Sequence, residues 1–407
     1  MARTAFLTRA YNAAPFLSEA VESVLHQTDG DFVYFLCDNG STDGTGSLVR
    51  SFAARDPRIV PIAWEKNSPL ESMNLLLQRV YESGCEYFAV LDADDAYEPE
   101  FLRTGIARLE ETGADLFLCG SRFFSQDGPR GQRALPEPVT IDRADFGARF
   151  PPLHTHLRAY WAKLFRLSVL LHPPLFVDNS LFYGSDTVFL LDAFARCRRV
   201  TGTPELLHRY RLHGSSDSHR LLPGRFEDDK RQHARTVGIL RENGWLTDEN
   251  RLFLARVFLN ACADTAFLAM HQKELSMRAA VLGEVFSSPE LHAAWERLLR
   301  EAPQAPEHDR IRATAQAGFV SLRAPLVPGP DEEPPPDEDA LRAALVLRDA
   351  APYCESRLHH AEALLLLSVY ARRAGDDRVS RLAARELAES GDLPDKEIGR
   401  ASCRERV

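Results

Sequence analysis

Residues 87–95 read YFAVLDADD, so a nearly all-apolar run passes directly into acidic side chains. A continuous apolar run bounded by polar residues is typical of a central strand in a parallel sheet, and ligands bind beyond the carboxyl ends of such strands. Asp92 and Asp94 are two positions apart and point the same way if the strand geometry persists. Their oxygens would suit Mg²⁺ or Mn²⁺, with phosphate oxygens of a substrate completing the shell. The alternative is that these carboxylates cap a helix that starts near Pro99.

The first 125 residues alternate regularly between strand-like and helix-like segments. We expect strands at 4–8, 32–37, 59–64, 87–91 and 115–119, and helices at 15–27, 43–54, 69–81 and 99–111. This alternation predicts the α/β class, with right-handed βαβ units and a mainly parallel sheet covered by helices. The carboxyl ends of the strands should then form one ligand-binding edge.

The composition is that of a globular protein. With 407 residues, 44% hydrophobic and 27% charged, the chain is long enough for two or three domains. No apolar run approaches the roughly 20 residues of a membrane span, and a strand expected from residue 4 leaves no room for a signal peptide, so we expect a cytoplasmic protein without a transmembrane segment. The 7 scattered cysteines predict reduced, mostly buried thiols. A net charge of −10 argues against a broad nucleic-acid surface.

Residues 38–45, which read DNGSTDGT, follow the second expected strand. The Asn-Gly pair favours a positive φ angle, and Ser41 or Thr42 before a helix is an ordinary N-cap signal. This local role does not exclude a second one. Asp38 lies at the end of the strand, where its carboxylate could accept the N–H of a pyrimidine base.

Four segments together resemble the family 2 glycosyltransferases in their order and spacing. They are AYNAAPFL at 10–17, AVESVLHQT at 20–28, DNGSTDGT at 38–45 and LDADD at 91–95. The resemblance implies a GT-A fold, which is a Rossmann-like, mainly parallel sheet flanked by helices. It also implies a nucleotide-sugar donor, a Mn²⁺ or Mg²⁺ ion, and transfer with inversion at the anomeric carbon.

The same resemblance implies roles for individual donor-site residues. Carried over by position, Ala10 and Tyr11 would border the base, and Asp38 would bind it. Asp92 would lie near the ribose, and Asp94 would ligate the metal.

Residues 160–165, YWAKLF, resemble the family segment that flanks the acceptor cleft. Trp161 and Lys163 would then bind the acceptor, with Lys163 approaching a phosphate or the acceptor itself. The alternative is an amphipathic helix in which Trp161 and Leu164 pack and Lys163 is solvated.

Residues 184–189, GSDTVF, occupy the place of the family's Glu-Asp motif, with Ser185 where Glu is common. Asp186 is then the candidate general base, because the transfer needs one carboxylate near the acceptor hydroxyl. The alternative is an N-cap for a helix at 188–195.

Residues 210–216, YRLHGSS, resemble the family's Tyr-Arg-x-His stretch. His213 would supply a nitrogen ligand to the metal or contact the diphosphate, and Arg211 would offset leaving-group charge. The alternative is that His213 is polar surface.

Two departures from the family pattern bear on the donor. Arg9 stands in a Thr-Arg-Ala entry where an apolar-Pro entry is usual, and Met73 stands where many members carry Arg. The nucleotide therefore stays open, with UDP as the expectation weighted by the family.

The sequence beyond about residue 225 predicts helices without a catalytic signature. We expect a catalytic domain at 1–225, a helical extension at 226–324, an acidic, proline-rich linker at 325–338 and a helical hairpin region at 339–396. The hairpins have a rhythm like tetratricopeptide units. They would form either a partner or homodimer surface or a face packed on the catalytic domain. Residues 397–407 resemble a translated sequencing-adapter read-through and are left out of the fold prediction.

The resemblance therefore implies an inverting glycosyltransferase that moves a sugar from a nucleoside-diphosphate sugar to the hydroxyl of a glycan, small-molecule or peptide acceptor. One rival is a sugar-1-phosphate nucleotidyltransferase, which favours a glycine-rich basic loop after the first strand, whereas residues 9–14 contain no glycine. The other is a non-catalytic nucleotide-binding or scaffold protein that acts through its C-terminal helices.

Overall fold

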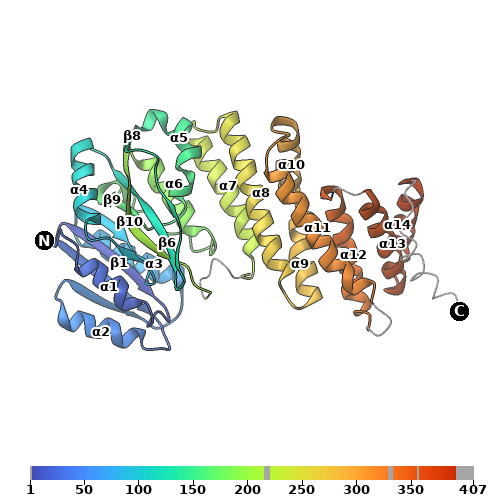
Figure 1. Ribbon diagram of the computed structural model, residues 1–407, viewed down its shortest axis with the longest axis horizontal. Coiled ribbons are helices and arrows are strands. Elements are labelled where there is room, and N and C mark those ends of the chain that lie inside the picture. Colours follow the sequence, from blue (N-terminus) through green and yellow to red (C-terminus); the bar gives the residue numbers. More distant parts are fainter. Residues whose placement is uncertain (1, 215–220, 329–332, 355–356, 391–407) are drawn as a thin grey trace. The chain divides into compact units, whose positions relative to one another are not determined.

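The computed structural model describes residues 2–214, 221–328, 333–354 and 357–390. They fall into two compact units, one drawn from 1–217 and 234–250 and the other from 218–233 and 251–407. Every strand of the described chain lies in the first unit, in the blue-to-green part of Figure 1, while the yellow-to-red part is helical. The predicted tail at 397–407 lies outside the described residues, as does the middle of the predicted linker.

The first unit contains a 10-stranded sheet in the order β3-β2-β1-β4-β9-β6-β10-β5, with β7 paired to β6 and β8 paired to β10. Its strands are β1 (Thr4–Ala10), β2 (Phe32–Asn39), β3 (Ile59–Trp64), β4 (Tyr87–Val90), β5 (Ala96–Tyr97), β6 (Leu116–Ser125), β7 (Gly128–Arg133), β8 (Val139–Asp142), β9 (Lys163–Arg166) and β10 (Arg199–Arg211). The neighbours β3, β2, β1 and β4 are parallel, as are β6 and β10. The pairings of β5, β7, β8 and β9 are antiparallel.

Helices flank this sheet, so the predicted α/β class with a mainly parallel sheet is confirmed. They are α1 (Leu17–Leu25), α2 (Thr45–Arg55), α3 (Pro69–Glu82), α4 (Phe101–Thr112), α5 (Phe146–Leu153) and α6 (Ser185–Arg196), with short 3-10 turns η1 (Arg143–Asp145), η2 (His154–Leu157) and η3 (Leu167–Leu170). All nine elements predicted within residues 1–125 are present, and the bounds of β3 are those predicted.

The core beneath the parallel strands is aromatic. Phe6 at the centre of β1 is completely buried, and its ring contacts those of Phe32 at 5.5 Å and Tyr97 at 6.0 Å. Tyr97 in turn stacks on Phe101 at the start of α4, with the ring centroids 3.8 Å apart. Burial of such large side chains is the main favourable term in folding, and here it fixes the strand ends that carry the polar side chains.

The alternative of an amphipathic helix over residues 160–165 is wrong. Lys163 begins β9, which lies between β4 and β6 and is antiparallel to both. Ala162, immediately before the strand, has a φ angle of 59°, a left-handed conformation that no continuing helix contains. The apolar spacing of so short a segment fits a strand as well as a helix, and the sheet pairing decides between them.

The second unit is an array of helices around one continuous apolar core. The helices of this half of the chain are α7 (Arg225–Glu242), α8 (Asp248–Met270), α9 (Leu275–Phe286), α10 (Pro289–Glu301), α11 (Glu307–Leu326), α12 (Asp337–Ala350), α13 (Arg357–Arg373) and α14 (Asp377–Ser390), with a 3-10 turn η5 (Ala351–Tyr353). The helical character predicted beyond about residue 225 is confirmed for the described residues. The domain boundaries and the homodimer surface stay predictions.

One helix differs from what the sequence led us to expect about membrane spans. Among the described residues, α8 is long and apolar enough to cross a membrane by length and composition alone. Half of its most apolar window is buried inside the protein, as in the core helices of soluble proteins that pass the same test, so the evidence for a span is weak.

Candidate donor and metal site

The acidic side chains after β4 converge, as the sequence predicted. The strand ends at Val90, and the chain turns so that the Asp95 N–H donates to the Asp92 carbonyl oxygen at 3.2 Å. One carboxylate oxygen from each of Asp92, Asp94 and Asp95 lies within 4.8 Å of the others. A tight turn, not continued strand geometry, brings them together. The alternative role as a helix cap is wrong, because α4 begins at Phe101 with no side-chain cap bond at its N-cap residue Glu100.

The electrostatics of this cluster favour a bound cation. Burial, followed by the charges of Asp95 and Asp94, raises the pKa of Asp92 well above its usual value. Burial and the charge of Asp94 likewise raise the pKa of Asp95. Carboxylates crowded in this way repel one another, and a divalent cation that prefers oxygen ligands relieves the repulsion. The donor set therefore fits Mg²⁺ or Mn²⁺.

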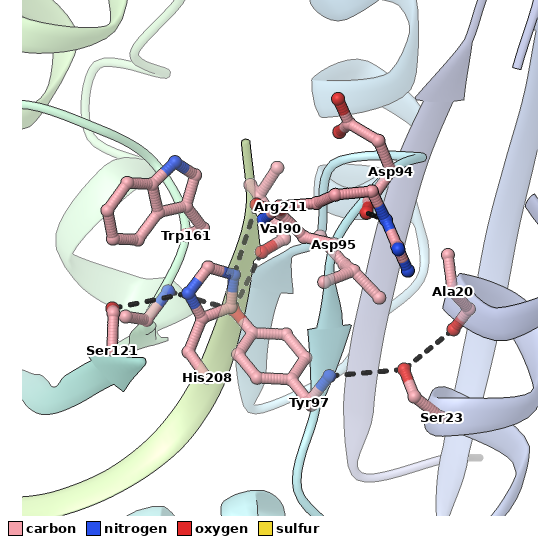
Figure 2. Close-up of polar contacts among 12 residues, drawn as sticks. Ala20, Ser23, Val90, Asp94, Asp95, Tyr97, Ser121, Trp161, His208 and Arg211 are labelled. Carbon is pink, nitrogen blue, oxygen red and sulfur yellow. Dashed lines mark hydrogen bonds and ion pairs between the residues drawn. The ribbon is translucent and has the colours of Figure 1, made fainter. Parts of the chain in front are cut away.

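Asp95 joins the cluster to the interior of the sheet, as Figure 2 shows. Its side chain is 1% exposed, and Oδ2 lies 3.3 Å from Nε2 of the completely buried His208 on β10. Nδ1 of His208 lies 3.2 Å from the Ser121 hydroxyl oxygen on β6. This buried contact places the acidic turn against β10, beside β6.

Arg211 and His213, at the end of β10, reach the same cluster. The Arg211 backbone N–H donates to Asp95 Oδ1 at 2.8 Å, and its Nε donates to the Asp94 carbonyl oxygen at 2.9 Å. Nε2 of His213 lies 2.8 Å from Asp94 Oδ2, and its ring packs 4.7 Å from that of Phe16. The structure thus brings together residues from two distant parts of the sequence. The contact between His213 and Asp94 disfavours the alternative that His213 is simply polar surface.

The loops after β1 and β2 hold each other through hydrogen bonds. The Asn12 N–H donates to the Ser41 hydroxyl at 3.0 Å, and the Thr42 N–H donates to Asn12 Oδ1 at 2.9 Å. Ser41 and Thr42 therefore do not cap α2, which begins at Thr45, and the Thr45 N–H donates instead to Asp43 Oδ1 at 2.9 Å. The predicted positive φ of the Asn-Gly pair is confirmed at Gly40, at 76°.

The three residues expected to contact the base lie at these loops. Asp38 is at the end of β2, and its Oδ1 accepts the Ser41 N–H at 3.1 Å. Tyr11 is 43% exposed and so presents its ring to a ligand, whereas Ala10 is completely buried and offers only its backbone. Their contacts with a nucleotide stay predictions.

Asp186 lies in the first turn of α6, not at its N-cap. Gly184 takes that position with a φ angle of 83°, so the N-cap alternative is wrong. Burial raises the pKa of the Asp186 carboxyl. The charge of Asp186 contributes to the raised pKa of Asp92, and both carboxylates contribute to that of Tyr160. Asp186 therefore shares one electrostatic environment with the acidic cluster.

Trp161 and Lys163 lie deeper than an acceptor surface requires. Trp161 is 8% exposed, and its ring stacks on His208 with the centroids 4.7 Å apart (Figure 2). Lys163 is 2% exposed and donates its ammonium to the Trp161 carbonyl oxygen at 2.9 Å. Burial, aided by Arg133, lowers the pKa of Lys163 to about 7. The alternative of a solvated Lys163 is wrong, and the acceptor-binding role of both residues stays a prediction.

Some contributors to the site come together only in the fold. His208 and Glu19 carried no recognisable signal, because their partners Asp95 and Arg211 are distant in sequence. Arg9 was treated only as a departure, yet it donates to the Pro69 carbonyl oxygen and its charge opposes the rise in the pKa of Asp92. Met73, at the place where many family members carry Arg, is buried.

Comparison with known proteins finds similarity over this region. Residues 6–171 match the family model described as glycosyl transferase family 2. The chain is 25% identical over 219 residues to an uncharacterised glycosyltransferase, EpsJ, of Bacillus subtilis, covering 51% of this chain and 60% of that protein. It is 26% identical over 324 residues to the succinoglycan biosynthesis protein ExoO of Rhizobium meliloti, covering 71% of this chain and 89% of that protein. The crystal structure of S. aureus TarS 1-349 in complex with UDP-GlcNAc aligns over 95% of this chain and 92% of that chain, at 14% identity and a TM-score of 0.49.

Proposed function

We propose that the chain, whose residues 6–171 match the family model described as glycosyl transferase family 2, is a metal-dependent, inverting glycosyltransferase. The donor is a nucleoside-diphosphate sugar, with UDP as the nucleotide, and the acceptor group is a hydroxyl. One observation carries the proposal. The cluster of Asp92, Asp94 and Asp95 lies at the carboxyl end of a parallel strand, with His213 2.8 Å from Asp94.

The donor is held along the sheet edge. Tyr11 and Asp38 contact the base, and Asp92 contacts the ribose. Asp94 and His213 would hold the metal. The Asp94 side chain is 31% exposed and so is more accessible than that of Asp95, which is 1% exposed and turned toward His208. A bound Mn²⁺ or Mg²⁺ ion supplies positive charge to the departing diphosphate. Arg211, fixed by Asp95 and Glu19, adds a second positive charge near that position.

Asp186 is the general base of the proposed reaction. The acceptor hydroxyl oxygen attacks the anomeric carbon from the face opposite the diphosphate, and the carboxylate takes the hydroxyl proton as the new bond forms. Burial raises the pKa of Asp186, which makes the carboxylate a better proton acceptor than an exposed aspartate.

Donor turnover tests the proposal without knowledge of the acceptor. The purified protein is incubated with UDP-glucose, UDP-N-acetylglucosamine, GDP-mannose and dTDP-glucose, with Mn²⁺ or with EDTA, and the released nucleotide is quantified. We expect release from one donor class only with metal, and loss of release in Asp94→Ala. Release that survives both EDTA and Asp94→Ala would refute the metal-dependent mechanism. An acceptor found with the same assay then allows the anomeric configuration of the product to be read by proton NMR, with inversion expected.

A further inference from the structure

A pocket in the first unit lies apart from the acidic cluster. It has a volume of about 380 Å³ and is lined by residues of α5, η2, β8 and the connection between β7 and β8. The elements β8 and α5 are labelled in Figure 1. Its wall includes the apolar side chains of Leu135, Ile141 and Leu153. The sequence analysis assigned nothing to this region.

Two arginines give this pocket its charge. Arg133 and Arg149 both line it, together with one carboxylate, that of Glu137. Within the described ranges, no ion pair links either arginine to an acid. The Arg133 guanidinium lies 4.6 Å over the ring of Trp161 and 5.6 Å over that of Phe123, and it donates to the Thr155 carbonyl oxygen.

The environment of Arg133 is costly for a cation. Burial, aided by the nearby charge of Arg158, lowers the pKa of Arg133 to about 10. A partly desolvated guanidinium without a counter-ion is unfavourable, and a planar anion that accepts two of its N–H groups would relieve that cost. His156, which also lines the pocket, is kept neutral by burial, because its pKa is lowered to about 4. The pocket therefore combines an apolar wall with a partly buried Arg133 and an exposed Arg149, and no ion pair among the described residues joins either to an acid.

We propose that this pocket is a subsite for an anionic group of the acceptor, a carboxylate or a phosphate, held by Arg133 and Arg149. The inference rests on the proposed glycosyltransferase function. The link to that reaction is a column of contacts, because Arg133 lies over Trp161, Trp161 stacks on His208, and His208 contacts Asp95 of the acidic cluster. The rings of this column are buried, so it joins the pocket to the acidic cluster through packed side chains. The proposed acceptor lies outside the column, with its charge in the pocket and a hydroxyl near the donor. The apolar wall then contacts the C–H faces of a sugar ring or a short linker.

Ligand-observed NMR of the full chain tests the subsite by binding alone. Saturation transfer is measured for p-nitrophenyl glucuronide and glycerol 3-phosphate, with p-nitrophenyl glucoside and glycerol as their neutral counterparts. We expect transfer to at least one acidic probe and not to its neutral counterpart. Stronger binding of the glucuronide would assign the anion to a sugar acid, and stronger binding of the phosphate would assign it to a phosphorylated acceptor.

Variants of equal charge change identify the pocket as the binding site. Arg149→Gln should weaken binding of the preferred acidic probe at least fivefold, whereas Arg103→Gln, at an exposed ion pair on α4, should leave it unchanged. Glu137→Gln removes the acid of the pocket and should strengthen binding. Arg133 is left intact because it packs on Trp161.

Two results would overturn the subsite. One is that the Arg149→Gln protein binds the acidic probe as tightly as the Arg103→Gln protein does. The other is the failure of both acidic probes to bind. Metal-dependent binding of UDP is measured on the same samples. If UDP binds and the acidic probes do not, the subsite is wrong while the proposed function stands. If UDP does not bind, the proposed function fails by itself.

Discussion

Asp186 shows how one buried carboxylate acquires a chemical role. It lies in the first turn of a helix whose N-cap is glycine, so its side chain is not needed to cap the helix. Burial raises its pKa, and the residue shares its electrostatic environment with Asp92 across a long stretch of sequence. The acidic residue could be predicted from the resemblance to a family motif, but its burial could not.

Replacement of this carboxylate should separate chemistry from donor binding. Asp186→Asn preserves the shape of the side chain and removes the base, so kcat should fall by roughly 10²–10⁴-fold. Metal-dependent affinity for UDP should change little, because Asp186 is not among the expected donor contacts. Steady-state kinetics with an acceptor, together with calorimetric titration of UDP, measure the two quantities. A variant with full kcat would remove Asp186 as the base.

A buried histidine predicts how the stability of the first unit depends on pH. His154 is 5% exposed, and burial lowers its pKa to about 3 from an ordinary 6.5. The pKa of His154 is lower in the folded state than in the unfolded state. The stability that the neutral side chain contributes is therefore fully present above pH 6.5 and is lost as the pH falls toward 3. Between pH 7 and pH 5 the loss should be on the order of 2 kcal/mol.

Thermal or urea unfolding across this pH range measures that loss. His154→Gln should flatten the dependence, whatever its effect on stability at pH 7. His26→Gln is the control, since the side chain of His26 is 72% exposed. An unchanged slope in His154→Gln would show that other groups cause the acid sensitivity.

At the scale of elements, helix α2 contacts Asp38 through a glycine. A Cβ atom built on Gly46 would lie 2.3 Å from Asp38 Oδ2, so a larger residue would force the carboxylate to rotate. Gly46→Ala should favour the helix itself by up to about 1 kcal/mol, yet displace the group expected to bind the base. We therefore expect a several-fold rise in the Kd for UDP without loss of stability.

Gly44→Ala is the matched control for this change. Its added Cβ would lie 3.7 Å from the nearest atom, the Ala14 Cβ, which is an ordinary contact. Titration with UDP in the presence of Mn²⁺ measures the Kd of each variant. Equal Kd values for the two variants would mean that Asp38 does not contact the base.

Short-range patterns predicted the elements better than they predicted the contacts between them. The alternation of residues 4–119 placed every strand and helix of the parallel half of the sheet, because each was long enough to show its period. The apolar spacing at 160–165 does not distinguish a helix from a strand, and only pairing with β4 and β6 makes part of it a strand. His208 could not be found from sequence, because its link to Asp95 depends on the register of β10 against β5.

At the scale of the molecule, the first compact unit includes a segment from beyond the predicted catalytic domain. Residues 234–250 belong to it, and within them Trp245 packs on Phe146 and Phe194 with ring centroids 5.5 and 5.7 Å away. Asn250 also donates to the Gly147 carbonyl oxygen at 2.7 Å. The helical pattern of the sequence predicts helical structure for residues 234–250. It does not predict which compact unit these residues join.

Truncated chains should reveal this dependence. A chain of residues 1–225 lacks Trp245 and exposes two phenylalanine rings, so it should be less stable than residues 1–250 by several kcal/mol. Urea unfolding followed by circular dichroism compares the two chains, with the full chain as reference. Equal stability would place the boundary of the folding unit at 225 and contradict the role of Trp245.

We propose that the acidic turn after β4 holds a metal ion together with a nucleotide. Thermal shift with UDP, GDP, dTDP and CDP, each with and without Mn²⁺, tests it most directly, with Asp94→Ala as the control. At about 100 times its Kd, a ligand should stabilise the unit that binds it by about 2.7 kcal/mol. We predict a shift from one nucleotide that requires both Mn²⁺ and Asp94. A protein that no nucleotide stabilises in the presence of Mn²⁺, or one stabilised equally in Asp94→Ala, would contradict the account.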